Sequence, residues 1–253
     1  MRFSDRVILV TGASRGIGAA IATAFAAEGG LVIVNFRENA AAAEAVVAAC
    51  RARGGAALAI AADVTSPEAV AEMARRIGEE AGRLDAVVNN AFAPYRFDPD
   101  NRVRFAETPW SAYQTQFDGA VRAAYTVVQA TLPLLRGGAS IVNLASDLVS
   151  RPSIPYHDYT TAKAALVGFS RNLAAELGPL GVRVNCVAPG LVEGTQGSRF
   201  TGEAVRETLV AQTPLRRLAT PEDVAGPVLF LAGDDSRFVT GQVLHVDGGL
   251  VMG

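Results

Sequence analysis

The feature that most constrains the fold is a regular alternation of short apolar runs with longer alanine-rich segments along the 253 residues. The apolar runs are rich in Val, Ile and Leu and are nearly continuous, which is typical of strands buried on both faces of a parallel sheet. The predicted strands lie at residues 7–10, 31–34, 58–60, 86–88, 140–144, 182–187 and 243–246. The predicted helices between them lie at residues 17–28, 40–53, 67–80, 110–135, 158–177 and 221–231.

This order of elements predicts one doubly wound α/β domain over residues 1–253, with helices on both faces of the sheet. Half of the residues are apolar, which is enough to bury a substantial core. Residues 92–108 and 191–213 lack a regular pattern and follow the fourth and sixth strands. Ligands bind outside the carboxyl ends of strands in such sheets, so both loops are candidate substrate-binding elements.

The charge balance and the cysteine content exclude several classes of protein. The chain has 23 basic and 25 acidic residues, a net charge of −2, which argues against binding to nucleic acids or to a membrane surface. No apolar run approaches the roughly 18 residues of a membrane span, and the first residues lack the pattern of a cleavable signal. Cys50 and Cys186 fit a reducing cytosol, so we expect a cytoplasmic protein. No Cys, His or carboxylate cluster has zinc-ligand spacing, so no metal is expected.

A glycine-rich segment, Thr11-Gly12-Ala13-Ser14-Arg15-Gly16-Ile17-Gly18, joins the first strand to the first helix. Gly12 suits a tight turn, Gly16 lets the backbone approach a pyrophosphate, and Gly18 lets the helix pack close to the sheet. The helix N-terminus adds N–H donors and a positive dipole end. The position of this segment between a strand and a helix therefore favours dinucleotide binding over a simple turn.

Residues at the ends of the next strands indicate which dinucleotide binds. The second strand ends in Asn35-Phe36-Arg37, where an NAD-selective site would carry an acidic side chain for the ribose 2′-hydroxyl. Arg15 and Arg37 could instead hold a 2′-phosphate, which predicts NADP(H); the alternative is two solvated arginines. Asp63 could accept from the adenine amino group, and Asn90 could hold the backbone and the ribose.

The use of basic residues singles out one position, because Lys163 is the only lysine among 23 basic residues. Lys163 follows Tyr159 by four residues on a predicted helix, so the ammonium and the phenol lie close together. A nearby ammonium lowers the pKa of a tyrosine, as a general acid or base requires. Ser146, just past the fifth strand, completes a three-residue catalytic set. Tyr-x-x-x-Lys alone is a weak motif; the unique lysine and the upstream serine make it specific.

These motifs together resemble the classical short-chain dehydrogenase/reductase family over essentially the whole chain. The matching residues are 11–18, Asp63-Val64, Asn89-Asn90-Ala91, Ser146, 159–163, Pro189-Gly190 and Asp247-Gly248-Gly249. The resemblance implies a seven-stranded Rossmann sheet, a nicotinamide cofactor, Tyr159 as proton donor, Ser146 as carbonyl orienter and Lys163 on the nicotinamide ribose. The residues expected to contact NADP(H) are Gly12, Ser14, Arg15, Gly16, Ile17, Gly18, Arg37, Asp63, Val64, Asn90, Ala91, Tyr159, Lys163, Pro189, Gly190 and Val192.

The resemblance is greatest to the 3-oxoacyl-acyl-carrier-protein reductase-like enzymes, with some departures. The family's relay asparagine aligns with Ala120, and Phe92 replaces the glycine that ends the family's Asn-Asn-Ala-Gly motif. The threonine expected after Pro189-Gly190 falls at Gly194, with Thr195 one residue later. Leu180 occupies one of the basic positions that these reductases use for their protein partner, which weakens the case for an acyl-carrier partner.

The expected reaction is NADPH-dependent reduction of a carbonyl in a 3-oxoacyl thioester, carried on acyl carrier protein or coenzyme A. Another small ketone, a sugar or a cyclic alcohol is the alternative, and a non-catalytic NADP-binding sensor is the alternative from a different class. Such sensors commonly lose the tyrosine or the lysine, and both are present. The alanine-rich helices at 117–135 and 158–177 have more apolar surface than one sheet face covers, so we expect a homotetramer, as the resemblance also implies.

Overall fold

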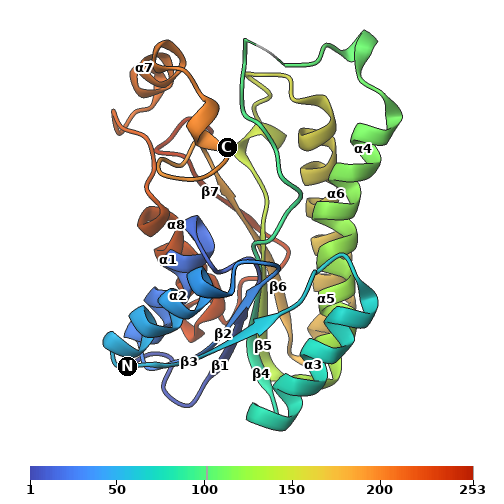
Figure 1. Ribbon diagram of the computed structural model, residues 1–253, viewed down its shortest axis with the longest axis vertical. Helices are drawn as coiled ribbons and strands as arrows, with labels where there is room; N and C mark the ends of the chain where they lie inside the picture. Colours follow the sequence, from blue (N-terminus) through green and yellow to red (C-terminus); the bar gives the residue numbers. More distant parts are fainter. Residues whose placement is uncertain (101, 253) are drawn as a thin grey trace.

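The computed structural model describes residues 1–100 and 102–252. A sheet of seven parallel strands in the order β3-β2-β1-β4-β5-β6-β7 runs through its centre (Figure 1). The sheet is doubly wound and Rossmann-like, as the apolar runs predicted. Its strands are β1 (Val7–Val10), β2 (Leu31–Phe36), β3 (Ala56–Ala61), β4 (Leu84–Asn89), β5 (Leu135–Leu144), β6 (Arg183–Pro189) and β7 (Val243–Val246).

Helices cover both faces of this sheet (Figure 1). The helices α1, α2 and α8 bury their apolar residues against one face, whereas α3, α5 and α6 pack against the other. The helices are α1 (Gly16–Ala27), α2 (Ala40–Ala52), α3 (Pro67–Ala81), α4 (Trp110–Phe117), α5 (Ala123–Thr131), α6 (His157–Leu177), α7 (Glu203–Gln212) and α8 (Pro221–Ala232).

Strand β1 shows why the apolar runs are continuous. Ile8 and Val10 point into the core under α1, α2 and α8, whereas Val7 and Leu9 point into the core under α3, α5 and α6. All four side chains are buried. Neither face of the strand is left to water, so no position along it favours a polar residue.

Two helix starts follow the local signals in the sequence. The Ser66 hydroxyl accepts from the N–H of Ala69 at 3.2 Å, and Pro67 takes the first turn, where a missing N–H costs nothing. Thr220 begins α8 in a capping box, in which the Asp223 carboxylate accepts from the Thr220 N–H at 2.8 Å. These contacts fix where the two helices begin.

The predicted helix at 110–135 is not continuous. A π-helical turn over Asp118–Arg122 separates α4 from α5. Gly119 in this turn lies so close to the segment after β4 that a Cβ would come within 2.3 Å of the Ala93 Cβ. The turn, as π-turns often do, occurs beside the cavity described below.

The stretch at 191–213 was expected to lack regular structure, yet it contains α7. None of the residues of α7, all of which the structure describes, is buried. Only the half-buried Val205, Leu209 and Val210 repeat at helical spacing, so the apolar pattern of this helix is short.

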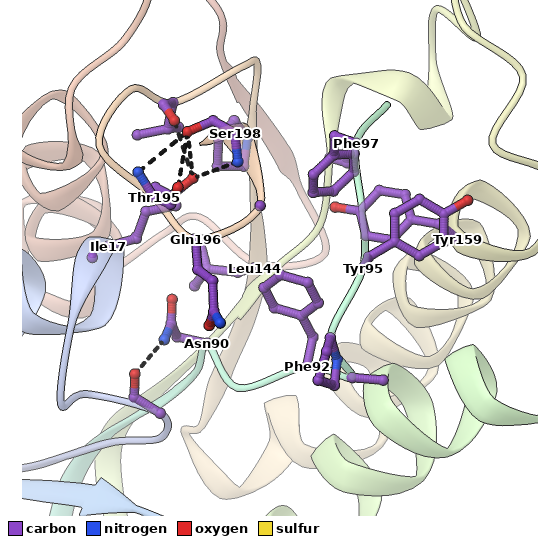
Figure 2. A pocket seen from close by; sticks show the side chains of 18 of the residues that line it. Ile17, Asn90, Phe92, Tyr95, Phe97, Leu144, Tyr159, Thr195, Gln196 and Ser198 are labelled. Carbon is purple, nitrogen blue, oxygen red and sulfur yellow. Dashed lines mark hydrogen bonds between the residues drawn. The ribbon is translucent and has the colours of Figure 1, made fainter. Parts of the chain in front are cut away.

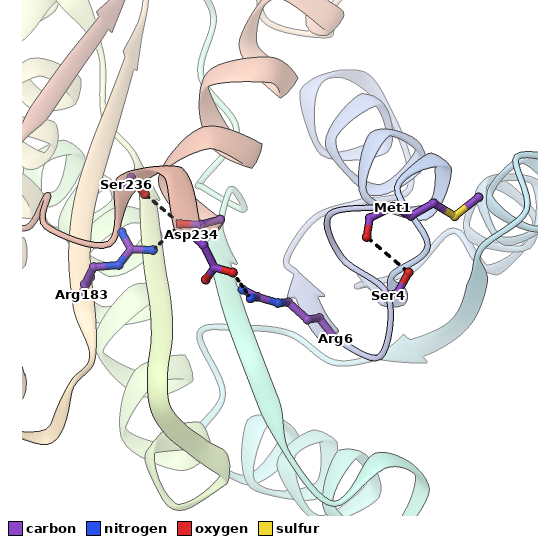
Figure 3. A network of polar contacts seen from close by, with 7 residues as sticks. Met1, Ser4, Arg6, Arg183, Asp234 and Ser236 are labelled. Atoms are coloured by element: carbon purple, nitrogen blue, oxygen red, sulfur yellow. Dashed lines mark hydrogen bonds and ion pairs between the residues drawn. The ribbon is translucent and has the colours of Figure 1, made fainter.

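A polar network fixes the far end of α8 (Figure 3). The Arg183 guanidinium donates to the carbonyl oxygens of Leu231 at 2.8 Å and Gly233 at 3.0 Å, where the helix ends. A cation suits this end of the helix dipole. Asp234, the next residue, pairs with Arg6 at 2.6 Å, which links the start of the chain to the same corner.

Both cysteines are buried. Cys50 lies inside α2 and Cys186 inside β6, and burial raises the pKa of the Cys50 thiol to about 11. Within the described residues, no helix is both long enough and apolar enough to span a bilayer.

Candidate active site

A cavity of about 1070 Å³ lies outside the carboxyl ends of the strands. Its lining comes from the glycine-rich segment, from the segments that follow β2 to β6 and from α6. Every residue predicted to contact the cofactor or to act in catalysis is part of this lining. The structure therefore brings the whole predicted set together in one place.

The glycine-rich segment forms a cradle that only glycine allows. Gly12 and Gly16 have φ angles of +61° and +55°, which side chains rarely adopt. A Cβ on Gly18 would lie 2.6 Å from the Gly12 carbonyl oxygen, so α1 could not pack this close with any other residue. A Cβ on Gly16, by contrast, would have the Thr195 Cγ2 at 3.9 Å as its nearest atom. Open space at the N-terminus of a helix fits the pyrophosphate of a dinucleotide.

Two asparagines hold the cradle in place. The side-chain Oδ1 of Asn35 accepts from the Gly12 N–H at 3.2 Å, and the side-chain Nδ2 of Asn35 donates to the Ala62 carbonyl oxygen at 3.0 Å. The Asn90 amide donates to the carbonyl oxygens of Thr11 at 2.9 Å and Gly12 at 3.2 Å. Sequence reasoning did not single out Asn35, although a polar residue in a buried apolar strand was the available signal.

Charged side chains surround the far end of the cavity. Arg15 and Arg37 both line it, and Arg37 pairs with the neighbouring Glu38 at 2.9 Å. Asp63 accepts from the hydroxyl and the N–H of Thr65 through one carboxylate oxygen. These hydrogen bonds hold the pKa of Asp63 below its usual value. The Arg37 guanidinium adds to this effect.

Ser146, Tyr159 and Lys163 come from two neighbouring segments. Ser146 follows β5 and caps the 3₁₀ turn Asp147–Val149, where its Oγ accepts from the Leu148 N–H at 3.3 Å. Tyr159 and Lys163 lie one turn apart on the buried side of α6 and are 7% and 4% exposed. The Lys163 Nζ donates to the Leu144 carbonyl oxygen at 2.6 Å and lies 5.8 Å from the Tyr159 ring centroid.

The pKa of Tyr159 does not move in the direction expected from the sequence. Burial raises it well above 10, the nearby Asp147 carboxylate adds to the rise, and the hydrogen bond with Ser146 acts the other way. Burial also lowers the pKa of Lys163 to about 8. The expectation that Lys163 lowers the pKa of the phenol is wrong for this arrangement, because desolvation outweighs other effects and the amine is directed at a carbonyl.

The expected relay position carries no polar side chain. Ala120 is buried within the π-helical turn that joins α4 to α5. Thr195, near the position of the expected threonine, uses its hydroxyl within its own turn, where it contacts the Val192 carbonyl and the Ser198 hydroxyl. Both departures noted in the sequence therefore persist in the structure.

Aromatic rings enclose Tyr159 (Figure 2). The Tyr159 ring centroid lies 5.0 Å from those of Tyr95 and Phe97 and 6.3 Å from that of Phe92. Tyr156 packs edge-on against Tyr95 and Phe97 at 5.5 and 5.6 Å. The loop after β4 was expected to contact substrate, but the convergence of its rings on Tyr159 was not predicted, since it depends on how the loop folds back.

A second segment packs against this aromatic loop. The Thr201 hydroxyl donates to the Phe97 carbonyl at 3.1 Å, and the Arg96 guanidinium lies 4.7 Å from the Phe200 ring centroid. A Cβ on Gly197 would come within 2.7 Å of the Phe97 ring, so the two segments are in close contact. We call residues 92–98 and 195–201 the lid, because the first segment packs its rings against Tyr159 and the second packs against the first.

Comparison with known proteins places the chain among oxidoreductases. The family model described as enoyl-(acyl carrier protein) reductase matches residues 12–251. An uncharacterized oxidoreductase of Methylorubrum extorquens is 40% identical and is matched over 98% of this chain and 99% of its own length. The 3-oxoacyl-[acyl-carrier-protein] reductase FabG of Staphylococcus epidermidis is 35% identical over 98% of this chain and 100% of its own.

Solved structures give the same result. The promiscuous reductase LugOII, which catalyses keto-reduction at C1 during lugdunomycin biosynthesis, superposes with a TM-score of 0.90 at 30% identity over the full length of both chains. A 7α-hydroxysteroid dehydrogenase with NADH has a TM-score of 0.89 at 31% identity over 98% and 95%. A blue fluorescent protein with NADPH has 0.87 at 33% over the full length of both chains. The chain therefore belongs to the short-chain dehydrogenase/reductase family of oxidoreductases, which use nicotinamide cofactors.

Proposed function

We propose that the protein is an NADP(H)-dependent reductase that converts a ketone carbonyl to a secondary alcohol. The observation that carries this proposal is the convergence of Ser146, Tyr159 and Lys163 on the cavity that also contains the glycine cradle. Reduced nicotinamide, when bound, supplies the hydride to the carbonyl carbon. The residues of the chain must then bind the substrate, orient its carbonyl and supply a proton.

Each of the three residues has a distinct role in this mechanism. The Tyr159 phenol donates its proton to the carbonyl oxygen, and its raised pKa keeps it protonated at neutral pH. The Ser146 hydroxyl donates a hydrogen bond to the same oxygen and orients the carbonyl. The Lys163 amine binds the ribose hydroxyls of the cofactor. The lid excludes water from the reacting atoms, which strengthens these polar contacts.

NADP(H) is proposed as the cofactor because Arg15 and Arg37 line the end of the cavity next to Asp63. A hydrogen bond to a charged group contributes about 1.5–3 kcal/mol, so the two arginines should give at least about a tenfold preference. Fluorescence titration of both cofactors tests this. We expect tighter binding of NADPH and a shift toward NADH in Phe36→Asp, whose new carboxylate would repel a 2′-phosphate. Equal affinities, or tighter NADH, would reject this choice of cofactor.

A 3-oxoacyl thioester is the first candidate substrate, carried on acyl carrier protein or coenzyme A. The relatives named 3-oxoacyl-[acyl-carrier-protein] reductase, at about 35% identity over the whole chain, support it. A ring-containing ketone is the second candidate. The observation that favours it is the set of rings around Tyr159, because flat apolar substrates pack well against aromatic side chains.

One panel of NADPH-oxidation assays separates these possibilities. The substrates are a 3-oxoacyl thioester, a keto-sugar and a cyclic ketone, and Tyr159→Phe is the control that removes the proton donor. A kcat/KM that is highest for the thioester supports the first candidate substrate. A kcat/KM that is highest for the cyclic ketone supports the second. Tight NADPH binding with no turnover of any carbonyl would overturn the proposal and favour an NADP-binding sensor.

A further inference from the structure

The Asp147 carboxyl lies inside the cavity beside Ser146. The Ser146 Oγ is 3.3 Å from the Asp147 Oδ1, and Asp147 is partly buried where the 3₁₀ turn begins. Gly190 lies next to both Asp147 and Asp247, because a Cβ there would lie 3.6 Å from the Asp147 Oδ2 and 3.1 Å from the Asp247 Cβ.

Several charged or titratable groups act on Asp147. Burial and the charge of Asp247, which follows β7, raise the pKa of Asp147 to about 6. Asp247 itself accepts from the N–H groups of Gly249 and Val251, both at 2.9 Å. Arg151 acts in the opposite direction on Asp147, as do the hydrogen bonds from Ser146 and the Leu148 N–H. Asp147 can therefore gain and lose a proton near neutral pH.

Ser146 connects Asp147 to the proton donor. A hydrogen bond from Ser146 lowers the pKa of the Tyr159 phenol, and the one Ser146 hydroxyl proton can instead be donated to the Asp147 Oδ1 at 3.3 Å. On the other side of Tyr159, the Lys163 amine donates to the Leu144 carbonyl and has further donors for the ribose hydroxyls, whereas Ala120 has no polar side-chain atom. The hydrogen-bonded contacts of Tyr159 thus lead toward Asp147.

We propose that Asp147 restores the proton of Tyr159 through Ser146 after each reduction. This inference rests on the proposed reductase activity. As the carbonyl carbon is reduced, the O–H bond of Tyr159 breaks and its proton passes to the carbonyl oxygen. The resulting phenolate takes the Ser146 hydroxyl proton while Ser146 takes the proton of the Asp147 carboxyl. The Asp147 carboxylate then takes up a proton from hydronium or a buffer acid in the solvent, and in the oxidation direction each transfer runs in reverse.

The test measures kcat from pH 5 to pH 9 in both directions for the wild type and for Asp147→Asn, which keeps the shape but cannot titrate. In the wild type, reduction should slow as the pH rises through about 6, whereas oxidation should speed up. Asp147→Asn should lose both of these dependences and lower kcat by about tenfold or more, with cofactor affinity unchanged. Asp147→Glu, which keeps a carboxyl, should retain a pH dependence and confirms that position 147 tolerates substitution.

The matched control is Asp235→Asn, an exposed carboxylate that does not line the cavity. Its pH profile should equal that of the wild type. Carbon-13 NMR of the side-chain carboxyls provides a readout without turnover: a resonance that titrates near pH 6 should be missing from Asp147→Asn. An active wild type with the same pH profile as Asp147→Asn overturns the relay alone. A wild type that reduces no carbonyl overturns the relay and the proposed function together.

Discussion

Burial sets the chemistry of Lys163. The side chain is 4% exposed, and its amine donates to the Leu144 carbonyl and lies 5.1 Å from the Phe92 ring centroid. The rest of the chain uses arginine for every other basic position, yet a guanidinium is planar, larger and more delocalised than an ammonium. The pocket is therefore fitted to a compact amine, which leads to two predictions.

The first prediction is that Lys163→Arg abolishes turnover although the positive charge is kept. A guanidinium cannot both fit the buried space and place one donor on the ribose hydroxyls, so kcat should fall by about 10²–10⁴-fold. The measurement is kcat with NADPH after circular dichroism has shown that the variant folds. Arg171→Lys on the exposed side of α6 is the reciprocal control and should leave kcat unchanged. A variant that keeps more than about a tenth of the wild-type kcat would refute the assigned role.

The second prediction is that Lys163→Met stabilises the fold at neutral pH. Burial lowers the pKa of Lys163 from 10.5 to about 8, so the charged amine costs stability fully below pH 8. That cost disappears as the pH rises from 8 to 10.5, where the amine is neutral in both the folded and unfolded states. Lys163→Met should therefore raise the free energy of unfolding by about 1–3 kcal/mol at pH 7.

Urea denaturation of the wild type and Lys163→Met at pH 7 and pH 9.5 measures this difference. The stability gain should be smaller at pH 9.5 than at pH 7. A variant that is less stable than the wild type at pH 7 would mean that the hydrogen bond to Leu144 outweighs the burial of charge.

At the scale of elements, the lid depends on one close contact. Gly197 lies against the Phe97 ring, and Thr201 holds the Phe97 carbonyl. Rings of the first segment pack against Tyr159 at the wall of the cavity, so a separation of the two segments would widen the access to it. Substrate entry and the packing of the two lid segments are therefore linked.

The third prediction is that Gly197→Ala opens the lid. The new Cβ would meet the Phe97 ring at 2.7 Å, and about 1 kcal/mol of strain would raise the open fraction about fivefold. Trypsin should then cleave after Arg96 or Arg199 faster in the native protein, because cleavage follows the population of the open form. Gly202→Ala is the matched control, since no atom lies within 4 Å of its Cβ position. Equal cleavage rates in the two variants would show that the contact does not hold the lid closed.

The elements differ in how well the sequence predicted them. The strands were predicted because they are buried on both faces, and the Ser66 and Thr220 caps marked the starts of α3 and α8. The π-helical turn at Gly119 could not be predicted, because its cause is the approach of Ala93 from another part of the chain. The α7 helix carries only a short apolar repeat, since none of its residues is fully buried.

The features of the site likewise divide into those that the sequence predicted and those that it did not. The glycine cradle and the Ser146, Tyr159 and Lys163 set have local spacings that the sequence shows directly, and the structure brings them together around one cavity. The ring cluster around Tyr159 and the direction of the Tyr159 pKa shift depend on burial by distant segments. Neither could be read from spacing along the chain.

At the scale of the whole molecule, large apolar side chains remain exposed on two separate faces. Trp110, Tyr125 and Leu132 are 68%, 47% and 38% exposed along α4, α5 and the turn after α5. Phe238 and Leu244 are 101% and 37% exposed around β7 at the sheet edge. Exposed apolar patches of this kind mark interfaces, and two different two-fold interfaces generate a tetramer with closed symmetry.

The fourth prediction is that the protein forms a homotetramer that Phe238→Asp splits into dimers. The new charge would be buried at the β7 face, whereas the face on α4 and α5 would stay intact. Light scattering at micromolar concentration should report a particle of four 26.3-kDa chains for the wild type and two for the variant. A wild-type monomer would refute the assembly, and a tetrameric variant would exclude the β7 face.

The single buried lysine also determines how the folded chain reacts with electrophiles. Acylation and isopeptide formation both begin with an uncharged ε-amine, and the only one in these 253 residues is enclosed behind the rings of Phe92 and Tyr159. The basic outer surface consists of guanidinium groups, which do not undergo these reactions at neutral pH. Any reagent that modifies a side-chain amine of the native protein must therefore reach the active site, so such modification would report directly on access to it.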